Sequence, residues 1–170
     1  TSGYSNQLIG EDAGGALTTG TFNVALGRNA LATATDTSQT VSIGSGAGDA
    51  INSTDANGTV SIGYFAASEL TSGQGNVAIG SSALLYEDDG DYNTAIGYQA
   101  LTDQTGVSGQ VGNIAVGYRA GYAVTSGKED TFIGFNAGDA TTTGLHNTAV
   151  GSQAFTTNVD GDHNTVVGYA

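Results

Sequence analysis

The sequence lacks several residue types that most domains of its size contain. Its 170 residues include no Cys, Pro, Met or Trp, and Lys and Arg together number only 3. Without cysteine, neither a disulfide framework nor a Cys-based metal site can form. There is no charged and apolar leader at the start and no run of about 18 apolar residues, so neither a signal peptide nor a membrane span is expected within this segment.

The charge of the chain has one dominant sign. The sequence holds 16 Asp and Glu residues, and its formal net charge is −13. Such a chain repels phosphate backbones and anionic lipid headgroups, which excludes nucleic acid as an expected partner. A repetitive β surface needs charge to avoid sticking to itself, so the acidity is typical of an exposed extracellular protein. We therefore expect the chain on a cell surface or a virion.

Glycine is abundant, with 28 residues, and many of the glycines are placed periodically. A glycine that follows Ile, Leu or Val recurs along the whole chain, and we call these residues the anchor glycines. They are Gly10, Gly27, Gly44, Gly63, Gly80, Gly97, Gly117, Gly134, Gly151 and Gly168. Seven of the nine intervals are 17 residues, and the other two are 19 and 20. Self-similarity at a fixed period indicates a repeat architecture.

Each unit alternates with period two just before its anchor glycine. In "VAIG", which ends at Gly80, Val77 and Ile79 would lie on one face of a strand and Ala78 on the other. Most units also carry a turn dipeptide seven residues before the anchor, such as Asp-Gly at Gly90, where glycine is expected to take a positive φ. Two short strands and two turns in about 17 residues are typical of one solenoid coil.

The sequence therefore predicts an all-β fold, a parallel β-solenoid or β-roll of about ten 17-residue coils. Residues 1–170 form a single repeat array, and coils about 4.8 Å apart would give a rod of roughly 45 Å. Insertions in the two longer units are expected as loops near 49–58 and 101–112. Because the chain starts without Met and in the middle of a repeat, we expect it to be part of a longer fibre.

Equivalent residues of successive coils would stack in columns. We expect Ile79 and Ile96 in an apolar column, and Ala83 and Ala100 in a column where only a methyl group fits. Asn stands four residues before seven of the ten anchors, which predicts a ladder in which side-chain amides bond above and below. The predicted structural positions are Asn76, Asn93, Asn113, Asn147, Asn164, Ile79, Ile96, Gly80, Gly97, Ala83 and Ala100.

Each coil offers only a few medium-sized apolar residues, so a single chain would have a thin core. The second face of the strands carries small residues, and its column is expected to form a smooth stripe against which another chain packs. The column contains Ala78, Ala95, Ala115 and Ala149. This pattern favours an oligomeric rod.

The repeats resemble those of known fibres. "NVAIGSSA" from Asn76 and "NTAIGYQA" from Asn93 resemble the "NSVAIGxxS" repeat in the heads of YadA-type trimeric autotransporter adhesins, which are parallel β-rolls of three identical chains. They are also similar to the "NTAxGxxAGxxxTTGxxN" arrays upstream of the self-cleaving chaperone domain in phage tail fibres. The resemblance covers Asn6 to Ala170. It implies an intertwined or side-by-side homotrimer, serving as a structural segment for attachment that presents a receptor-binding tip.

Two other functions stay open. The residue after the anchor is aromatic in five units: Tyr64, Tyr98, Tyr118, Phe135 and Tyr169. A row of aromatic side chains can stack on sugar rings or seal a seam between subunits. The first alternative is therefore a glycan-binding adhesin module, whose partner is a host cell-surface glycan or receptor. The second is a subunit of an extracellular structural filament.

Signals for chemistry are weak. His146 and His163 both stand five residues before an anchor, so they would stack on adjacent coils and are weak candidates for metal ligation. Asp88, Asp89 and Asp91 could attract Ca²⁺, the one cofactor that the sequence suggests, but they lack the spacing of an EF-hand loop. No acidic residue is framed by the apolar residues that would raise its pKa for acid–base catalysis. We expect no catalytic residue and no enzymatic activity.

Overall fold

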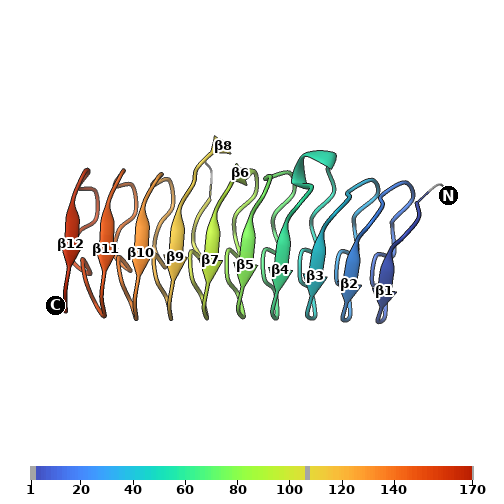
Figure 1. The fold of residues 1–170 in the computed structure, drawn as a ribbon, viewed down its shortest axis with the longest axis horizontal. Helices are drawn as coiled ribbons and strands as arrows, with labels where there is room; N and C mark the ends of the chain where they lie inside the picture. Colours follow the sequence, from blue (N-terminus) through green and yellow to red (C-terminus); the bar gives the residue numbers. More distant parts are fainter. Residues whose placement is uncertain (1–2, 106–107, 170) are drawn as a thin grey trace.

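The computed structural model describes residues 3–105 and 108–169. The chain is a parallel β-solenoid with almost no helix (Figure 1). Each repeat contributes one short strand to a ten-stranded parallel sheet, in which repeats that follow one another lie side by side. The strands are β1 (Gln7–Ile9), β2 (Val24–Leu26), β3 (Val41–Ile43), β4 (Val60–Ile62), β5 (Val77–Ile79), β7 (Thr94–Ile96), β9 (Ile114–Val116), β10 (Thr131–Ile133), β11 (Thr148–Val150) and β12 (Thr165–Val167). The predicted solenoid is confirmed, and ten strands correspond to about nine full turns.

The register of the sheet keeps equivalent residues in columns. Ile79 pairs with Ile96 across β5 and β7. The longer repeats keep this register, since Val41 pairs with Val60 across the 19-residue unit. The described residues of these insertions lie in the turns and hold the short helix η1 (Thr54–Ala56) and the strand β8 (Gly109–Gln110), which pairs with β6 (Gly90–Asp91). Residues 106–107 of the predicted second loop lie outside the described residues.

The prediction of two strands per coil is wrong for most of the rod. Apart from β6 and β8, the described part of each coil has one strand, and the remainder consists of turns. Several non-glycine residues in these turns have positive φ, including Tyr92 at 62°, Gln99 at 55° and Leu101 at 49°. The turns are still bonded between coils, because the backbone N–H of Leu101 donates to the Ala120 carbonyl at 3.1 Å. A second regular strand is therefore not needed to hold the stack together.

The middle residue of each strand faces the core and is small in most strands, while the first and third residues face outward. Ala78 and Ala95 are fully buried, while Ile79 and Ile96 are only half-buried on the outer face. Ile79 and Ile96 do stack in an apolar column, but it lies on the outer face. The alanine column is buried, so the predicted contact of this column with another chain is wrong. The reason lies in the opposite wall of the coil, where buried residues such as Leu84 fill the narrow interior. The strand then has room only for a methyl group, and Ala83 and Ala100 are also fully buried.

In two coils the inward residue of the strand is large, and the residue opposite it in the turn is glycine. In β10 the inward residue is Phe132, and the position four after the anchor glycine is Gly138 instead of leucine. A Cβ atom at Gly138 would lie 2.3 Å from Cδ1 of Phe132. In β1 the inward residue is Leu8, and a Cβ at Gly14 would lie 2.8 Å from its Cδ2. A large side chain on one wall thus requires a glycine on the other.

Glycine is required in two columns for different reasons. The anchor Gly80 has a φ of +134°, and a Cβ there would lie 2.3 Å from the carbonyl oxygen of Gly97 in the next coil. Gly73 represents the turn glycines, and its φ is not positive, contrary to the prediction for this column. Its Cβ would lie 2.3 Å from the carbonyl oxygen of Gly90. The turn glycine is therefore needed for close approach between coils and not for its backbone angle.

Candidate functional site: the outer sheet face and its borders

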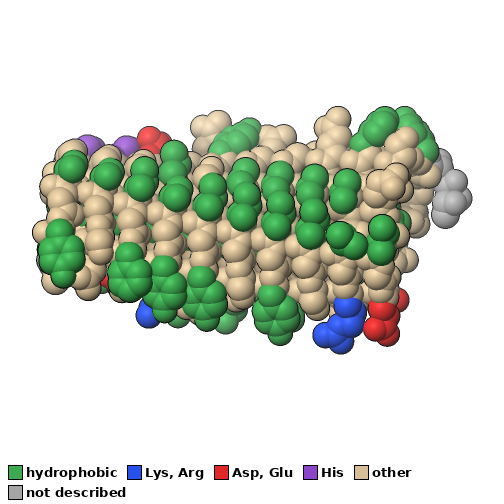
Figure 2. All heavy atoms as spheres, turned by 60° about the horizontal axis from the view of Figure 1, so that its bottom comes forward, with side chains coloured by type: hydrophobic (Ala, Val, Ile, Leu, Met, Phe, Trp, Pro, Cys, Tyr) green, Lys and Arg blue, Asp and Glu red, His purple; other side chains and the backbone are tan. Residues whose placement is uncertain are grey.

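The first and third residues of the ten stacked strands form a continuous surface, which we call the outer sheet face. None of these twenty residues is charged, and all but five are Val, Ile or Leu. Leu26 is 43% exposed and Ile133 39%, and the hydrophobic side chains form rows along the rod (Figure 2). The largest contiguous apolar patch on a soluble protein is often an interaction surface. This face is the strongest candidate for a contact with another molecule.

The aromatic column borders the outer sheet face, and all five of its members are exposed. The rings of Tyr98 and Tyr118 stack with centroids 5.5 Å apart, and Tyr118 stacks on Phe135 at 5.1 Å, both with an interplanar angle of 10°. Tyr64 packs edge-on against Phe65, and Tyr169 stands at 80% exposure. Because the middle rings cover one another's faces, they present edges outward. Edges suit a seam between chains better than they suit the flat face of a sugar ring.

The asparagine column connects successive coils through the backbone. Oδ1 of Asn76 accepts a hydrogen bond from the backbone N–H of Asn93 at 2.8 Å, and Nδ2 of Asn76 donates to the Gly90 carbonyl at 2.8 Å. Oδ1 of Asn93 accepts in turn from the backbone N–H of Asn113 at 3.0 Å. Each side chain thus satisfies the N–H group that stands just before the next strand. The predicted bonding between amide side chains is replaced over this stretch by bonding from side chain to backbone.

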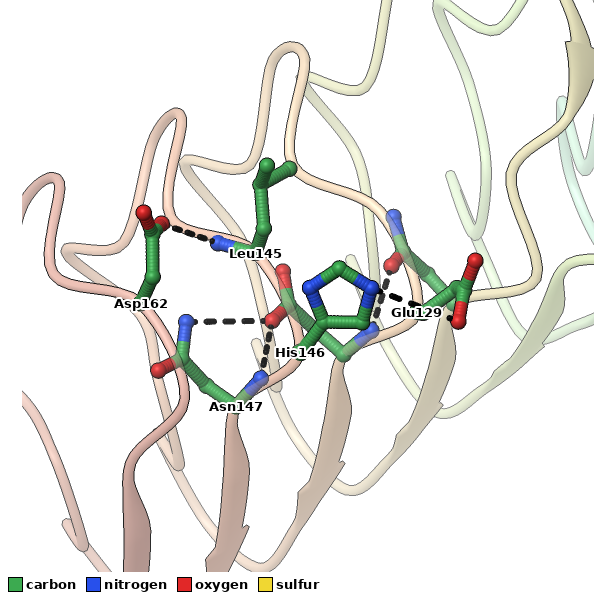
Figure 3. Close-up of polar contacts among 7 residues, drawn as sticks. Glu129, Leu145, His146, Asn147 and Asp162 are labelled. Carbon is green, nitrogen blue, oxygen red and sulfur yellow. Dashed lines mark hydrogen bonds and ion pairs between the residues drawn. The ribbon is translucent and has the colours of Figure 1, made fainter.

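The same column ends in a mixed network of side chains. Asp130 stands at an asparagine position, and its Oδ1 accepts from the backbone N–H of Asn147 at 2.7 Å and from Nδ2 of Asn147 at 3.1 Å (Figure 3). Nδ2 of Asn164 donates to Oδ1 of Asn147 at 3.0 Å. The other oxygen of Asp130, Oδ2, is buried and has no hydrogen-bond partner among the described residues. Burial raises the pKa of Asp130 to about 6, although the bonds from Asn147 act in the opposite direction.

The two histidines lie on the surface in one column with Glu129. The rings of His146 and His163 stack with centroids 4.8 Å apart. Nε2 of His146 lies 3.5 Å from Oε2 of Glu129 (Figure 3). Among the described residues, no group of three or more His, Asp or Glu side chains is arranged to hold a metal ion. The pair therefore remains a weak candidate for metal ligation.

Two of the three aspartates that the sequence suggests for Ca²⁺ accept hydrogen bonds from the preceding coil. Asp88 accepts through Oδ1 from the hydroxyl of Thr71 at 2.6 Å, and Asp91 accepts through Oδ1 from the backbone N–H of Gln74 at 2.8 Å. Asp89 lies between them and is half-buried. These bonds link neighbouring coils, which is a structural role for side chains that the sequence presents as Ca²⁺ candidates.

Glu87 is a structural residue that the sequence reasoning missed. It is fully buried, and its Oε1 accepts from the backbone N–H groups of Asp88, Asp89 and Gly90 at 3.1, 3.2 and 2.7 Å. Its Oε2 accepts from Nε2 of Gln104 in the next coil. Glu87 stands seven residues after its anchor glycine, and several other coils carry Leu or Ile at this position. This pattern in the sequence already indicated that the Glu87 side chain would be buried.

The chain matches no protein-family model, no curated protein and no solved structure. In the described part of the chain, no helix has the length and apolar character of a membrane span.

Replacing Asp130 with asparagine should stabilise the protein by about 1–2 kcal/mol at pH 7. In the equivalent position, Nδ2 of Asn113 donates to the Gly127 carbonyl at 2.7 Å, whereas Oδ2 of Asp130 makes no such bond among the described residues. Because its folded-state pKa is raised from 3.8 to about 6, Asp130 binds a proton more tightly in the folded state. Its presence should therefore lower stability as the pH rises from about 4 to about 6.

The check is urea unfolding of the parent and Asp130→Asn proteins from pH 4 to pH 7. The exposed Asp160→Asn variant, which removes the same charge, serves as the control. The stability curves of the parent and of the Asp130→Asn protein should diverge with rising pH, and parallel curves would show that Asp130 does not titrate in this range.

Proposed function

We propose that the chain is a structural segment of an extracellular attachment fibre in which three copies pack side by side along their outer sheet faces. The observation that carries this proposal is the absence of charge on a half-exposed aliphatic surface that follows the whole rod. Covering it removes apolar area from water, which is the main driving force for association. The hydrogen bonds of the sheet close within one chain, which favours packed rods over intertwined chains.

The number of copies comes from the resemblance of the repeats to trimeric fibres. The outer sheet face is a strip roughly 45 Å long and 10 Å wide, counted from coil spacing and strand length. Its area of about 450 Å² is smaller than the roughly 800 Å² that each partner contributes to a stable interface. The adjoining aromatic column would supply further area, so we assign it to the border between chains.

The mechanism of such a segment is passive rigidity. Each coil is held by hydrogen bonds to its neighbours, so stability is a sum over neighbouring coils and the rod resists bending. A stiff shaft provides reach and presents a receptor-binding tip, on a virion or on a bacterial surface. The net charge of −13 keeps adjacent fibres apart in solution.

The test is the solution mass measured by light scattering, with the parent chain and two charged variants. We expect three times 16.8 kDa for the parent chain and for Ser126→Glu, which adds a charge at an exposed turn outside the face. Ile96→Glu adds the same charge near the middle of the face and should shift the mass towards 16.8 kDa.

A parent chain that is folded and monomeric would contradict the trimeric fibre. A mass that grows with concentration beyond three copies would instead favour the filament subunit. An Ile96→Glu protein that remains trimeric would exclude the outer sheet face as the contact, even if the trimer itself stands.

A further inference from the structure

The two irregular repeats enclose a hollow on one side of the rod. They are separated by two regular coils, the ones that contain β5 and β7. In Figure 1, η1 and β8 both rise above the same side of the rod, and β6 lies between them. Since all other intervals are 17 residues, these insertions are the only departures from regularity in the repeat. η1 and β8 stand on either side of a floor that is two coils wide (Figure 1).

Two adjoining cavities lie on this floor, and we call them together the saddle. The larger has a volume of about 660 Å³, which is in the range of small-molecule sites. It is lined by Ala50, Glu69, Thr71, Tyr86, Asp88 and Thr105. The smaller, of about 280 Å³, is lined by residues that include Asp55, Ser72, Gln74, Asp89 and Asp91. Both cavities are lined from the same two coils, by Glu69 and Asp88 in the first and by Ser72 and Asp89 in the second.

The chemistry of the saddle differs from that of the rest of the surface. Five carboxylates line it together with hydroxyl and amide groups, and no Lys, Arg or His side chain of the described residues does. Tyr86 is 50% exposed and takes part in none of the ring pairs of the described residues. Unlike the middle rings of the aromatic column, it therefore has a face that no other described ring covers. The saddle combines an aromatic surface with acceptors for ammonium and hydroxyl groups.

We propose that the saddle binds an oligosaccharide of amino sugars whose amino groups are free and protonated. The apolar C–H face of a sugar ring would pack on Tyr86, and its ammonium and hydroxyl groups would donate to Glu69 and Asp88. A neutral glycan would leave the carboxylates without compensating charge. A metal ion would leave Tyr86 and most of the 660 Å³ unused. A lysine-rich peptide has the charge but lacks a flat apolar face.

The saddle is independent of the proposed trimer. It lies within one chain and shares no residue with the outer sheet face or the aromatic column. Copies that pack along the outer sheet face would leave it open, so a fibre would carry three such sites at each level. If the mass measurement shows no trimer, the proposed binding at the saddle is unaffected. If the saddle binds no glycan, the proposed trimer is unaffected.

The test is calorimetric titration at low salt with a β-1,4-linked glucosamine hexamer, and with the N-acetylated hexamer of the same length as the uncharged control. We expect the glucosamine hexamer to bind at least tenfold more tightly and to weaken as salt is added. Tyr86→Ala should weaken its binding at least tenfold, and Glu69→Gln several-fold. Ala50 occupies the position equivalent to Tyr86 two coils earlier, so the fold accepts alanine there.

The matched control is Tyr98→Ser, which removes an equally exposed tyrosine from the aromatic column. Serine stands at that position in other coils, as at Ser81, and binding should change less than twofold. The proposal is overturned if the N-acetylated hexamer binds equally well, if hexalysine binds more tightly, or if Tyr86→Ala leaves the affinity unchanged. It is also overturned if the glucosamine hexamer shows no binding at millimolar concentration, or if Tyr98→Ser abolishes binding.

Discussion

Gly97→Ala should destabilise the protein far more than Gly168→Ala, although both glycines have the same backbone conformation. The φ angle is +136° at Gly97 and +143° at Gly168. A Cβ at Gly97 would lie 2.2 Å from the carbonyl oxygen of Gly117 in the next coil. In the 170-residue segment Gly168 belongs to the last coil, and no atom of the described residues lies within 4 Å of its Cβ. Strain from the φ angle, of about 1–3 kcal/mol, is common to both substitutions. The clash with backbone occurs only at Gly97.

We expect Gly97→Ala to cost at least about 3 kcal/mol more than Gly168→Ala, a large part of the stability of a typical domain. The backbone cannot relieve the clash without moving one coil away from the next, which would break the strand pairing of Ile96 with Val116. Urea unfolding at one fixed protein concentration measures both variants, so that association contributes equally. Equal costs would mean that glycine is needed at the anchor only for its φ angle, and that coils tolerate a wider spacing.

The sequence predicts the stacking correctly because its signals for the stack are redundant. The anchor glycine, the asparagine column and the alanine three residues after the anchor all recur with one period, and they place the strands and their register. The sequence does not predict which side of each strand points towards the core. Period-two alternation separates Val77 and Ile79 from Ala78 but does not say which side faces the core. Size suggests the larger pair, yet Leu84 on the opposite wall already fills the coil.

The candidate surfaces were visible in the sequence to different degrees. The aromatic column appears as soon as the units are aligned, but the stacking that covers the ring of Tyr118 depends on ring rotation, which the sequence does not encode. The saddle could have been found in part, because Glu69 and Tyr86 occupy the same position in successive units. That η1 and β8 stand on either side of them depends on the path of the turns. Only the three-dimensional structure shows that path.

Because Phe132 and Gly138 face each other inside one coil, each single substitution should destabilise the protein strongly, and the double substitution should restore most of the stability. Phe132→Ala should cost about 3–5 kcal/mol, because a fully buried ring leaves a cavity. Gly138→Leu should be similarly harmful, since its Cβ would lie 2.3 Å from Cδ1 of Phe132. The combination of both changes recreates the pairing that the coil of Ala78 and Leu84 already uses.

We expect the double variant to lie within about 2 kcal/mol of the parent protein, which requires a coupling energy of several kcal/mol between the two sites. The backbone allows this rescue, because φ is 62° at Gly138 and 52° at Leu84, so leucine is already accepted in this conformation. Some loss remains, since a Cβ at Gly121 would also contact Phe132, and the leucine of Gly138→Leu does not fill that side.

The measurement is a double-mutant cycle by urea unfolding, with Gly138→Ala as the smaller intermediate step. If the costs of the two single changes simply add, the walls of the coil do not share one volume, and the inward facing of Phe132 is wrong. If the double variant is rescued, the two side chains share one volume inside this coil. The identity of Phe132 or of Gly138 then cannot be interpreted alone from the sequence.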